Sequence, residues 1–192
     1  MPSDSLWRHV FRRLQECARS GRKEEETASC KLLQKVPIFQ ELSGRELHKI
    51  EEMLYGPRDW RAGEAIINQG DPGMGMYIVA AGQIRIVQMG DDGFEKQLAT
   101  LTRGNFFGAQ ALVDQSPRPA SAYALQPCSL LVFCRPDLLE LIDTNLPLAL
   151  KIVEGLAQAI STDLLEVIEK LSTQLRDSER LLKGARRAGS IQ

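Results

Sequence analysis

The sequence predicts an α+β fold, in which an antiparallel β sandwich, roll or barrel lies between N-terminal helices and a long C-terminal helix. Between Gly56 and Pro136, short β-rich runs alternate with Gly, Pro and Asp at intervals typical of all-β domains. On either side, apolar residues recur every three or four positions, which indicates amphipathic helices. The 192 residues fit one domain with terminal extensions better than two full domains.

Composition and charge narrow the class of protein. Hydrophobic residues make up 43% and charged residues 26%, as in ordinary globular proteins. We expect a cytoplasmic protein, because the chain has neither a run of about 18 apolar residues nor an apolar N-terminal signal segment. Basic residues outnumber acidic ones by six to two in residues 1–23 and by five to two in residues 176–192. These ends would meet an acidic partner, a membrane surface or nucleic acid, or would simply be solvated helix faces.

Apolar spacing and capping signals predict the N-terminal helices. Residues 5–19 carry apolar side chains three and four positions apart, so they predict one amphipathic helix. The next helical stretch is expected to bend at Pro37, because proline lacks the amide hydrogen that a helix interior needs. Ser43 followed by Glu46 is a capping-box signature and predicts a helix over residues 44–54.

The central region predicts strands separated by glycine-containing turns. Turns are expected at residues 70–73, 81–82 and 90–93. The six β-rich runs are residues 64–67, 75–80, 83–89, 94–101, 121–125 and 129–133. Many short strands of this kind indicate a sandwich, roll or barrel.

The C-terminal third is predicted to be helical. A short helix covers residues 137–142, and a long one starts near Pro147 and ends at Gly184. Its apolar stripe consists of Val153, Ala157, Ile160, Leu164, Ile168, Leu171, Leu175, Ser178 and Leu182. This stripe is too long for a small β domain to cover, so we expect a helical partner. The alternative is that only the first half packs and the rest frays.

No residue set points to catalysis or to metal binding. The sequence has no Ser-His-Asp arrangement, HExxH motif or Walker loop. The four cysteines are scattered, which suits reduced core thiols. His9 and His48 lie far apart on polar, helix-like segments without nearby ligand residues. We therefore expect no enzyme activity, no metal and no cofactor.

Residues 101–121 are the most informative stretch of the chain. The small residues Gly108, Ala109 and Ala111 would open a short helical turn whose amide groups face an anion. Arg118 follows, and its planar guanidinium suits two-point contact with a phosphate. A turn with a surface arginine explains the same residues equally well.

The same stretch resembles the phosphate-binding cassette of the cyclic-nucleotide-binding domain family, of the catabolite activator protein and protein kinase A regulatory subunit type. The matching segments read Phe107-Gly-Ala-Gln-Ala-Leu112 and, five residues later, Arg118-Pro-Ala-Ser121. Upstream, Gln69-Gly-Asp-Pro-Gly73, Met76-Tyr-Ile-Val79 and Gly82-Gln-Ile-Arg85 also match. The resemblance covers about residues 30–165.

This resemblance implies a fold, a domain division and a ligand. The fold would be an antiparallel β-roll of the jelly-roll type over residues 30–143, preceded by a helix and linker (1–29) and followed by a dimerisation helix and tail (144–192). The ligand would be cyclic AMP, cyclic GMP or a cyclic dinucleotide. The residues implied to bind it are Phe107, Gly108, Ala109, Gln110, Ala111, Leu112, Arg118, Pro119, Ala120 and Ser121.

Ala109 departs from the family pattern, because it replaces the glutamate that accepts a hydrogen bond from the ribose 2′-hydroxyl. Losing a charged hydrogen bond costs about 1.5–3 kcal/mol. Three alternatives follow: altered binding of a cyclic nucleotide, binding of another phosphate ligand, or a degenerate pocket in a ligand-free interaction scaffold.

The output of such a domain is expected to pass through other proteins. Only about ten residues follow Lys183, too few for a helix-turn-helix motif, so no direct DNA binding is expected. No membrane association is expected either. The signal would pass to a protein partner or through a homodimer joined along residues 150–182.

Overall fold

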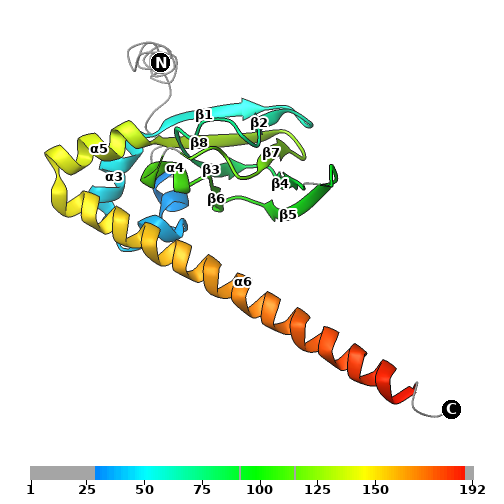
Figure 1. Ribbon diagram of the computed structural model, residues 1–192. Helices are drawn as coiled ribbons and strands as arrows, with labels where there is room; N and C mark the ends of the chain where they lie inside the picture. Colours follow the sequence, from blue (N-terminus) through cyan, green and yellow to red (C-terminus); the bar gives the residue numbers. More distant parts are fainter. Residues whose placement is uncertain (1–28, 91, 115, 189–192) are drawn as a thin grey trace.

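The structure, a computed structural model, describes residues 29–90, 92–114 and 116–188. At its centre, two four-stranded antiparallel sheets form a β-roll (Figure 1). One sheet has the order β1 (Tyr55–Trp60), β8 (Cys128–Cys134), β3 (Gly75–Ala81) and β6 (Phe106–Phe107). The other has the order β2 (Ala65–Ile67), β7 (Ser121–Ala124), β4 (Ile84–Met89) and β5 (Glu95–Leu101). The predicted fold class is confirmed.

Most helical segments lie at one end of the roll (Figure 1). Residues 29–33 are helical and lead to the 3-10 turn η1 (Pro37–Phe39) and to helix α3 (Gly44–Met53). The single-turn helix α4 (Gln110–Val113) follows β6, and α5 (Arg135–Thr144) and α6 (Leu146–Ala188) follow the last strand. The helix predicted over residues 5–19 falls outside the described residues. In the part of the chain that is described, no helix is long and apolar enough to cross a bilayer.

The predicted capping box of α3 is present and also fixes α6. The backbone N–H of Ser43 donates to Glu46 Oε2 at 2.8 Å. On its other side, Glu46 accepts a hydrogen bond from Lys151 of α6, with Nζ 2.9 Å from Oε1. The hydrogen bonds from Lys151 and then Ser43 lower the pKa of Glu46 to about 2. The start of α3 is thereby tied to the second turn of α6.

Two apolar clusters hold the domain together. Inside the roll, the buried members are Trp60, Val79, Ile84, Phe107, Ala122, Ala124, Cys128 and Leu130. The second and larger cluster fills the space between one sheet and the helices. It includes Leu33, Phe39, Leu47, Ile50, Phe133, Leu148, Ile152 and Leu156. Fully burying each large side chain contributes about 1.5–3 kcal/mol, so the helical end is a main part of the core.

On the described part of α6, the buried side chains all lie in the first four turns. Gly155 allows the closest approach, because a Cβ atom there would collide with the backbone carbonyl of Ile38 in η1. Leu148, Ile152, Leu156 and Ala159 form the buried face. The predicted stripe lies on another face, and its members from Val153 to Leu175 that have large apolar side chains are exposed. At 43 residues, α6 is about 65 Å long and projects far beyond the roll (Figure 1).

The structure corrects three sequence predictions. Strand β1 was not predicted, because Gly56, Pro57 and the charged pair after them lack β character. Proline is tolerated here because β1 lies at a sheet edge, paired with β8 alone. The two-residue strand β6 was also missed. Helix α6 does not end at Gly184 but continues to Ala188, since one interior glycine costs a helix only about 1 kcal/mol.

A buried carboxyl group lies where the roll meets the C-terminal helices. The hydroxyl of Tyr55 in β1 donates to Asp137 Oδ1 of α5 at 3.1 Å, whereas the buried Asp137 Oδ2 has no described hydrogen-bond partner. Burial raises the pKa of Asp137 to about 6, even though the bond from Tyr55 opposes the shift. The proton on Asp137 is therefore bound more tightly in the folded state than in the unfolded chain. The stability that this difference contributes is lost as the pH rises from about 4 through about 6.

We expect Asp137→Asn to raise the free energy of unfolding at pH 7.5 by roughly 1–3 kcal/mol, because the neutral amide avoids the cost of a buried charge. Urea denaturation at pH 4.5 and pH 7.5 measures the effect, which should shrink at the lower pH. Asp143→Asn, on the exposed face of α5, is the control and should change little. An equal effect of Asp137→Asn at both pH values would contradict this assignment.

Candidate functional site

The backbone around Arg118 is held by the turn at residues 70–73. Arg118 N–H donates to Asp71 O at 2.8 Å, and Gly70 N–H donates to Arg118 O at 2.9 Å. An isolated β-bridge joins Pro72 to Pro117 beside these bonds. The predicted turn therefore has a definite role, because it fixes the residue that carries the guanidinium.

The Arg118 side chain is buried at the base of the site, with an exposed fraction of 5%. Its Nη1 donates to Gly108 O at 2.9 Å and its Nη2 to Gly75 O at 2.7 Å. The guanidinium also lies over the Tyr77 ring, 5.9 Å from the ring centre. Among the described residues, none forms a hydrogen bond with the buried Nε, and no carboxylate forms an ion pair with the group. Burial accordingly lowers the pKa of Arg118.

Gly108 is required where the guanidinium approaches the chain. Its φ is +72°, a conformation that other residues rarely adopt. A Cβ atom at this position would also collide with Arg118 Nη1. Behind the guanidinium, the rings of Tyr77 and Phe107 stack at 5.2 Å. Glycine and the aromatic pair together set the position of the positive charge.

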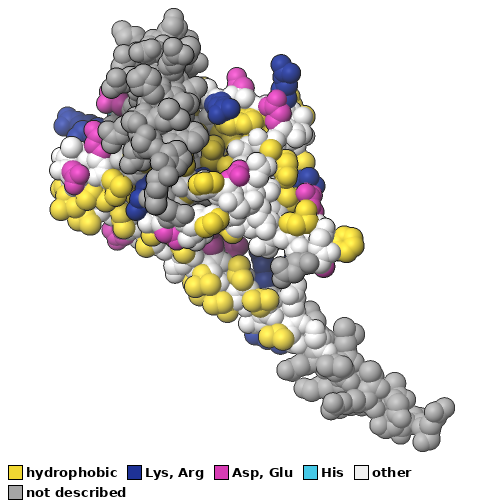
Figure 2. All heavy atoms as spheres, turned by 45° about the horizontal axis from the view of Figure 1, so that its top comes forward, with side chains coloured by type: hydrophobic (Ala, Val, Ile, Leu, Met, Phe, Trp, Pro, Cys, Tyr) yellow, Lys and Arg dark blue, Asp and Glu magenta, His cyan; other side chains and the backbone are white. Residues whose placement is uncertain are grey.

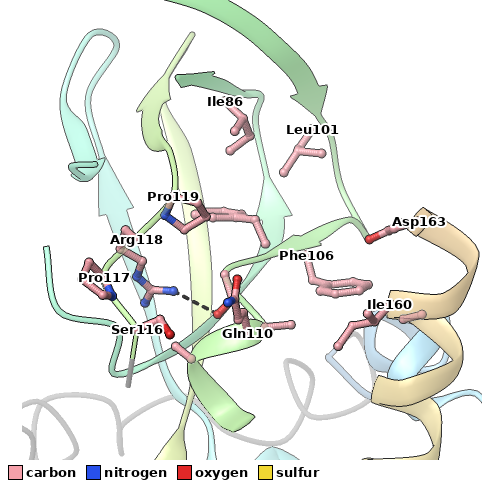
Figure 3. Close-up of a pocket in the computed structure, with 15 residues that line it drawn as sticks. Ile86, Leu101, Phe106, Gln110, Ser116, Pro117, Arg118, Pro119, Ile160 and Asp163 are labelled. Carbon is pink, nitrogen blue, oxygen red and sulfur yellow. Dashed lines mark hydrogen bonds between the residues drawn. The ribbon is translucent and has the colours of Figure 1, made fainter. Parts of the chain in front are cut away.

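A pocket of about 360 Å³ opens beside Arg118 (Figure 3). This volume lies in the range of small-molecule sites. Ile86, Leu101 and Phe106 provide apolar walls from the roll, and residues 108–111 and 116–119 line the side that holds Arg118. Helix α6 closes the opposite side with Ala159, Ile160 and Asp163.

The pocket carries one positive and one negative group at opposite sides. Among the residues that line it, only Arg118 and Asp163 are ionisable. Asp163 has a raised pKa, first because of burial and then because of the nearby Glu166. A ligand that fills the pocket would therefore contact a cation at one end and a carboxyl group at the other.

The structure brings together seven of the ten predicted ligand-binding residues. The residues that line the pocket are Phe107, Gly108, Ala109, Gln110, Ala111, Arg118 and Pro119. The other three lie elsewhere: Leu112 belongs to the apolar core, Ala120 lies outside the lining, and Ser121 Oγ accepts a hydrogen bond from the backbone N–H of Gln69 at 2.8 Å.

Sequence reasoning missed several residues that line the pocket. They are Ile86, Leu101, Phe106, Ser116, Pro117, Ala159, Ile160 and Asp163. Ile86, Leu101 and Phe106 belong to β4, β5 and β6. Their local sequence is that of ordinary strand residues, so nothing in it marks them as pocket residues. The three from α6 come close only because the helix crosses the mouth of the pocket.

Comparison with known families decides what kind of domain this is. Residues 57–145 match the family model described as "Cyclic nucleotide-binding domain". The chain contains a cyclic nucleotide-binding domain. The matched range extends from β1 to the start of α6, and so includes both sheets, α4 and Arg118. Domains of this family are typically regulatory and non-catalytic.

Curated proteins with similar cyclic nucleotide-binding domains are longer than this chain. The cyclic AMP receptor protein of Thermus thermophilus is 37% identical over 112 residues, which are 58% of this chain and 51% of that protein. The cAMP-dependent protein kinase type II regulatory subunit of Drosophila melanogaster is 36% identical over 127 residues, 64% of this chain and 32% of the subunit. The chain thus spans about half or less of these relatives.

A solved structure shows the same relationship in three dimensions. The Thermus thermophilus catabolite activator protein superposes with a TM-score of 0.64 at 34% identity, over 71% of this chain and 62% of that one. The cyclic nucleotide-binding domain described here is therefore related to both the bacterial activators and the kinase regulatory subunits.

Proposed function

We propose that this domain is a regulatory sensor that binds a cyclic nucleotide, or a related phosphate ligand, against Arg118. The observation that carries the proposal is the buried guanidinium, which has no described ion-pair partner and lines a pocket of ligand size. A buried charge without an opposite charge is costly, and a bound phosphate would neutralise it. The named relatives include a cyclic AMP receptor, which supports the same class of ligand.

The signal in this proposal leaves through α6. Binding in the pocket changes the contacts of Ile160 and Asp163, which belong to the helix that projects from the domain. A ligand shifts a conformational equilibrium only if it contacts the two states differently. The contribution of α6 to the pocket wall provides such a difference, because movement of the helix would open or close that wall.

The output would be a homodimer joined along residues 150–182. On the described part of α6, large apolar side chains stay exposed beyond the domain (Figure 2). They include Leu164, Leu165, Val167, Ile168, Leu171 and Leu175. Apolar surface of this extent suits an interface, and a second copy would cover it by placing the two stripes against each other.

A ligand-free scaffold is the alternative, and two observations favour it. Arg118 already donates hydrogen bonds to the carbonyl groups of Gly75 and Gly108, and these bonds use some of the N–H groups that a phosphate would need. Ala109 supplies no acceptor for a ribose hydroxyl at the position where the family has glutamate. In this alternative the domain acts only by holding partner helices through α6.

Calorimetric titration separates the two functions. The wild type and the Ala109→Glu variant would each be titrated with cyclic AMP, cyclic GMP and a cyclic dinucleotide. We expect the wild type to bind one of these, and Ala109→Glu to bind a cyclic mononucleotide about 10- to 150-fold more tightly, because one charged hydrogen bond is restored. Gln110→Glu, one position further along the same pocket wall, is the matched control and should not give this gain.

One result would count against the sensor, and another would change the ligand that it reads. If the wild type binds no member of the panel and Ala109→Glu gains nothing, the scaffold is favoured. If only the cyclic dinucleotide binds and Ala109→Glu weakens it, the domain remains a phosphate sensor but does not read a ribose in the way the family does.

A further inference from the structure

A second group of chemically reactive side chains lies away from the pocket, where residues 29–33 meet α3. Cys30 comes from the first of these segments, and His48 and Glu51 lie three residues apart on α3. One ligand atom from each residue lies within 4.8 Å of the other two. Sequence reasoning predicted no metal site, because the cysteines are scattered and neither histidine has a nearby set of ligand residues, but the fold brings Cys30 close to His48.

The distances within this group fit the coordination of a single metal ion. Cys30 Sγ lies 3.2 Å from Glu51 Oε2, and His48 Nδ1 lies 3.4 Å from the same oxygen. Donor atoms that share a tetrahedral zinc ion, at the usual zinc–ligand distances, are about 3.3–3.5 Å apart. Two of the three donor pairs therefore already lie within a few tenths of an ångström of the separations in a zinc site, and the third pair, Cys30 with His48, lies within 4.8 Å.

A fourth residue, Glu52, lies where a carboxylate orients the ring of a metal-binding histidine. Metal-binding histidines usually direct their second ring nitrogen at a carboxylate, which orients the ring. His48 directs Nδ1 at Glu51, and its Nε2 lies 3.7 Å from Glu52 Oε1. The two ring nitrogens thus face two different carboxylates, although the Glu52 carboxylate lies slightly beyond hydrogen-bond distance.

We propose that Cys30, His48 and Glu51 bind a divalent metal ion of the zinc class. Thiolate and imidazole donors favour zinc over magnesium or calcium, which prefer oxygen ligands alone. His48 is 48% exposed while Glu51 is only 14% exposed, so the ion would lie at the surface with one position open to water. The ion would join residues 29–33 to α3.

The position of the site gives the metal a structural consequence. Leu32 and Leu33 beside Cys30, and Leu47 and Ile50 of α3, belong to the core cluster that also holds the first turns of α6. A metal that binds the folded protein and not the unfolded chain stabilises the fold by mass action. Metal binding would therefore rigidify the same helical end against which α6 packs.

Cobalt(II) and zinc(II) titrations of the full, untagged and reduced chain test the proposal. We expect one cobalt per chain, with the visible bands of tetrahedral cobalt and a near-ultraviolet thiolate-to-cobalt band, and displacement of cobalt by zinc. Cys30→Ser should abolish the thiolate band. His48→Gln and Glu51→Gln should weaken binding at least about tenfold, and the positioning variant Glu52→Gln should weaken it less, although measurably.

The controls distinguish metal binding from a hydrogen-bonded surface cluster. Glu41→Gln, an exposed carboxylate before α3, should bind cobalt as the wild type does. The affinity for cobalt should decrease as the pH is lowered, because protons compete with the metal for the thiolate and the imidazole. Circular dichroism of each variant without metal establishes that it is folded. No saturable uptake by the wild type, or a thiolate band that survives in folded Cys30→Ser, would overturn the proposal.

Discussion

Replacing Arg118 with alanine should weaken phosphate-ligand binding by roughly a hundredfold or more. Among the described residues that line the pocket, only Arg118 is cationic, and its fork can give a phosphate two charge-assisted hydrogen bonds. At about 1.5–3 kcal/mol each, the loss of two such bonds corresponds to at least about two orders of magnitude in affinity. Isothermal titration calorimetry with whichever cyclic nucleotide binds the wild type measures the effect.

Two further variants show whether the effect belongs to ligand binding. Arg118→Lys keeps the charge but not the planar fork, so it should restore affinity only in part. Arg85→Ala removes an arginine from β4 that lies beside Glu95 and Tyr123, outside the pocket, and should leave affinity unchanged. Thermal unfolding of each ligand-free variant reports the structural cost separately. Equal affinities in wild type, Arg118→Ala and Arg118→Lys would show that Arg118 only braces the backbone.

The strands with regular β character were the part of the fold that the sequence predicted best. β3, β4, β5 and β8 begin and end within one or two residues of the predicted runs, because glycine-containing turns delimit the first three and prolines at positions 127 and 136 flank β8. β1 was missed because its stability comes from pairing with β8 rather than from its own residues. Tertiary pairing of this kind has no local signal, since β propensity depends strongly on context.

The candidate site likewise has a part that the sequence could predict and a part that depends on the fold. The stretch from Phe107 to Arg118 is continuous in sequence. Its small residues and arginine fit a phosphate site and a plain turn equally well, and the resemblance to the cyclic-nucleotide-binding family favoured the phosphate site. Asp163 and Ile160 could not be predicted as pocket residues, because their position depends on where α6 leaves α5 and crosses the roll. The same holds for Cys30 and His48, which meet only when two helical segments pack against each other.

The second large effect is expected on the exposed stripe of α6. Leu164 and Leu171 are 58% and 54% exposed and lie two turns apart on the same helix face. In a symmetric dimer, Leu164→Asp with Leu171→Asp would place four unpaired carboxylates in the apolar seam. At about 1–3 kcal/mol for each unsatisfied group, the dissociation constant should rise by roughly a thousandfold or more.

Light scattering coupled to size exclusion, run over a concentration series, measures this change. Thr162→Asp with Thr173→Asp is the matched control, because it adds the same charges on the polar face, where both hydroxyls bond only to backbone carbonyls of their own helix. That variant should remain a dimer. If the wild type is monomeric at high micromolar concentration, the stripe does not pair with a second copy. If both double variants dissociate equally, added charge rather than loss of the apolar seam is the cause, and α6 would not join the dimer through Leu164 and Leu171.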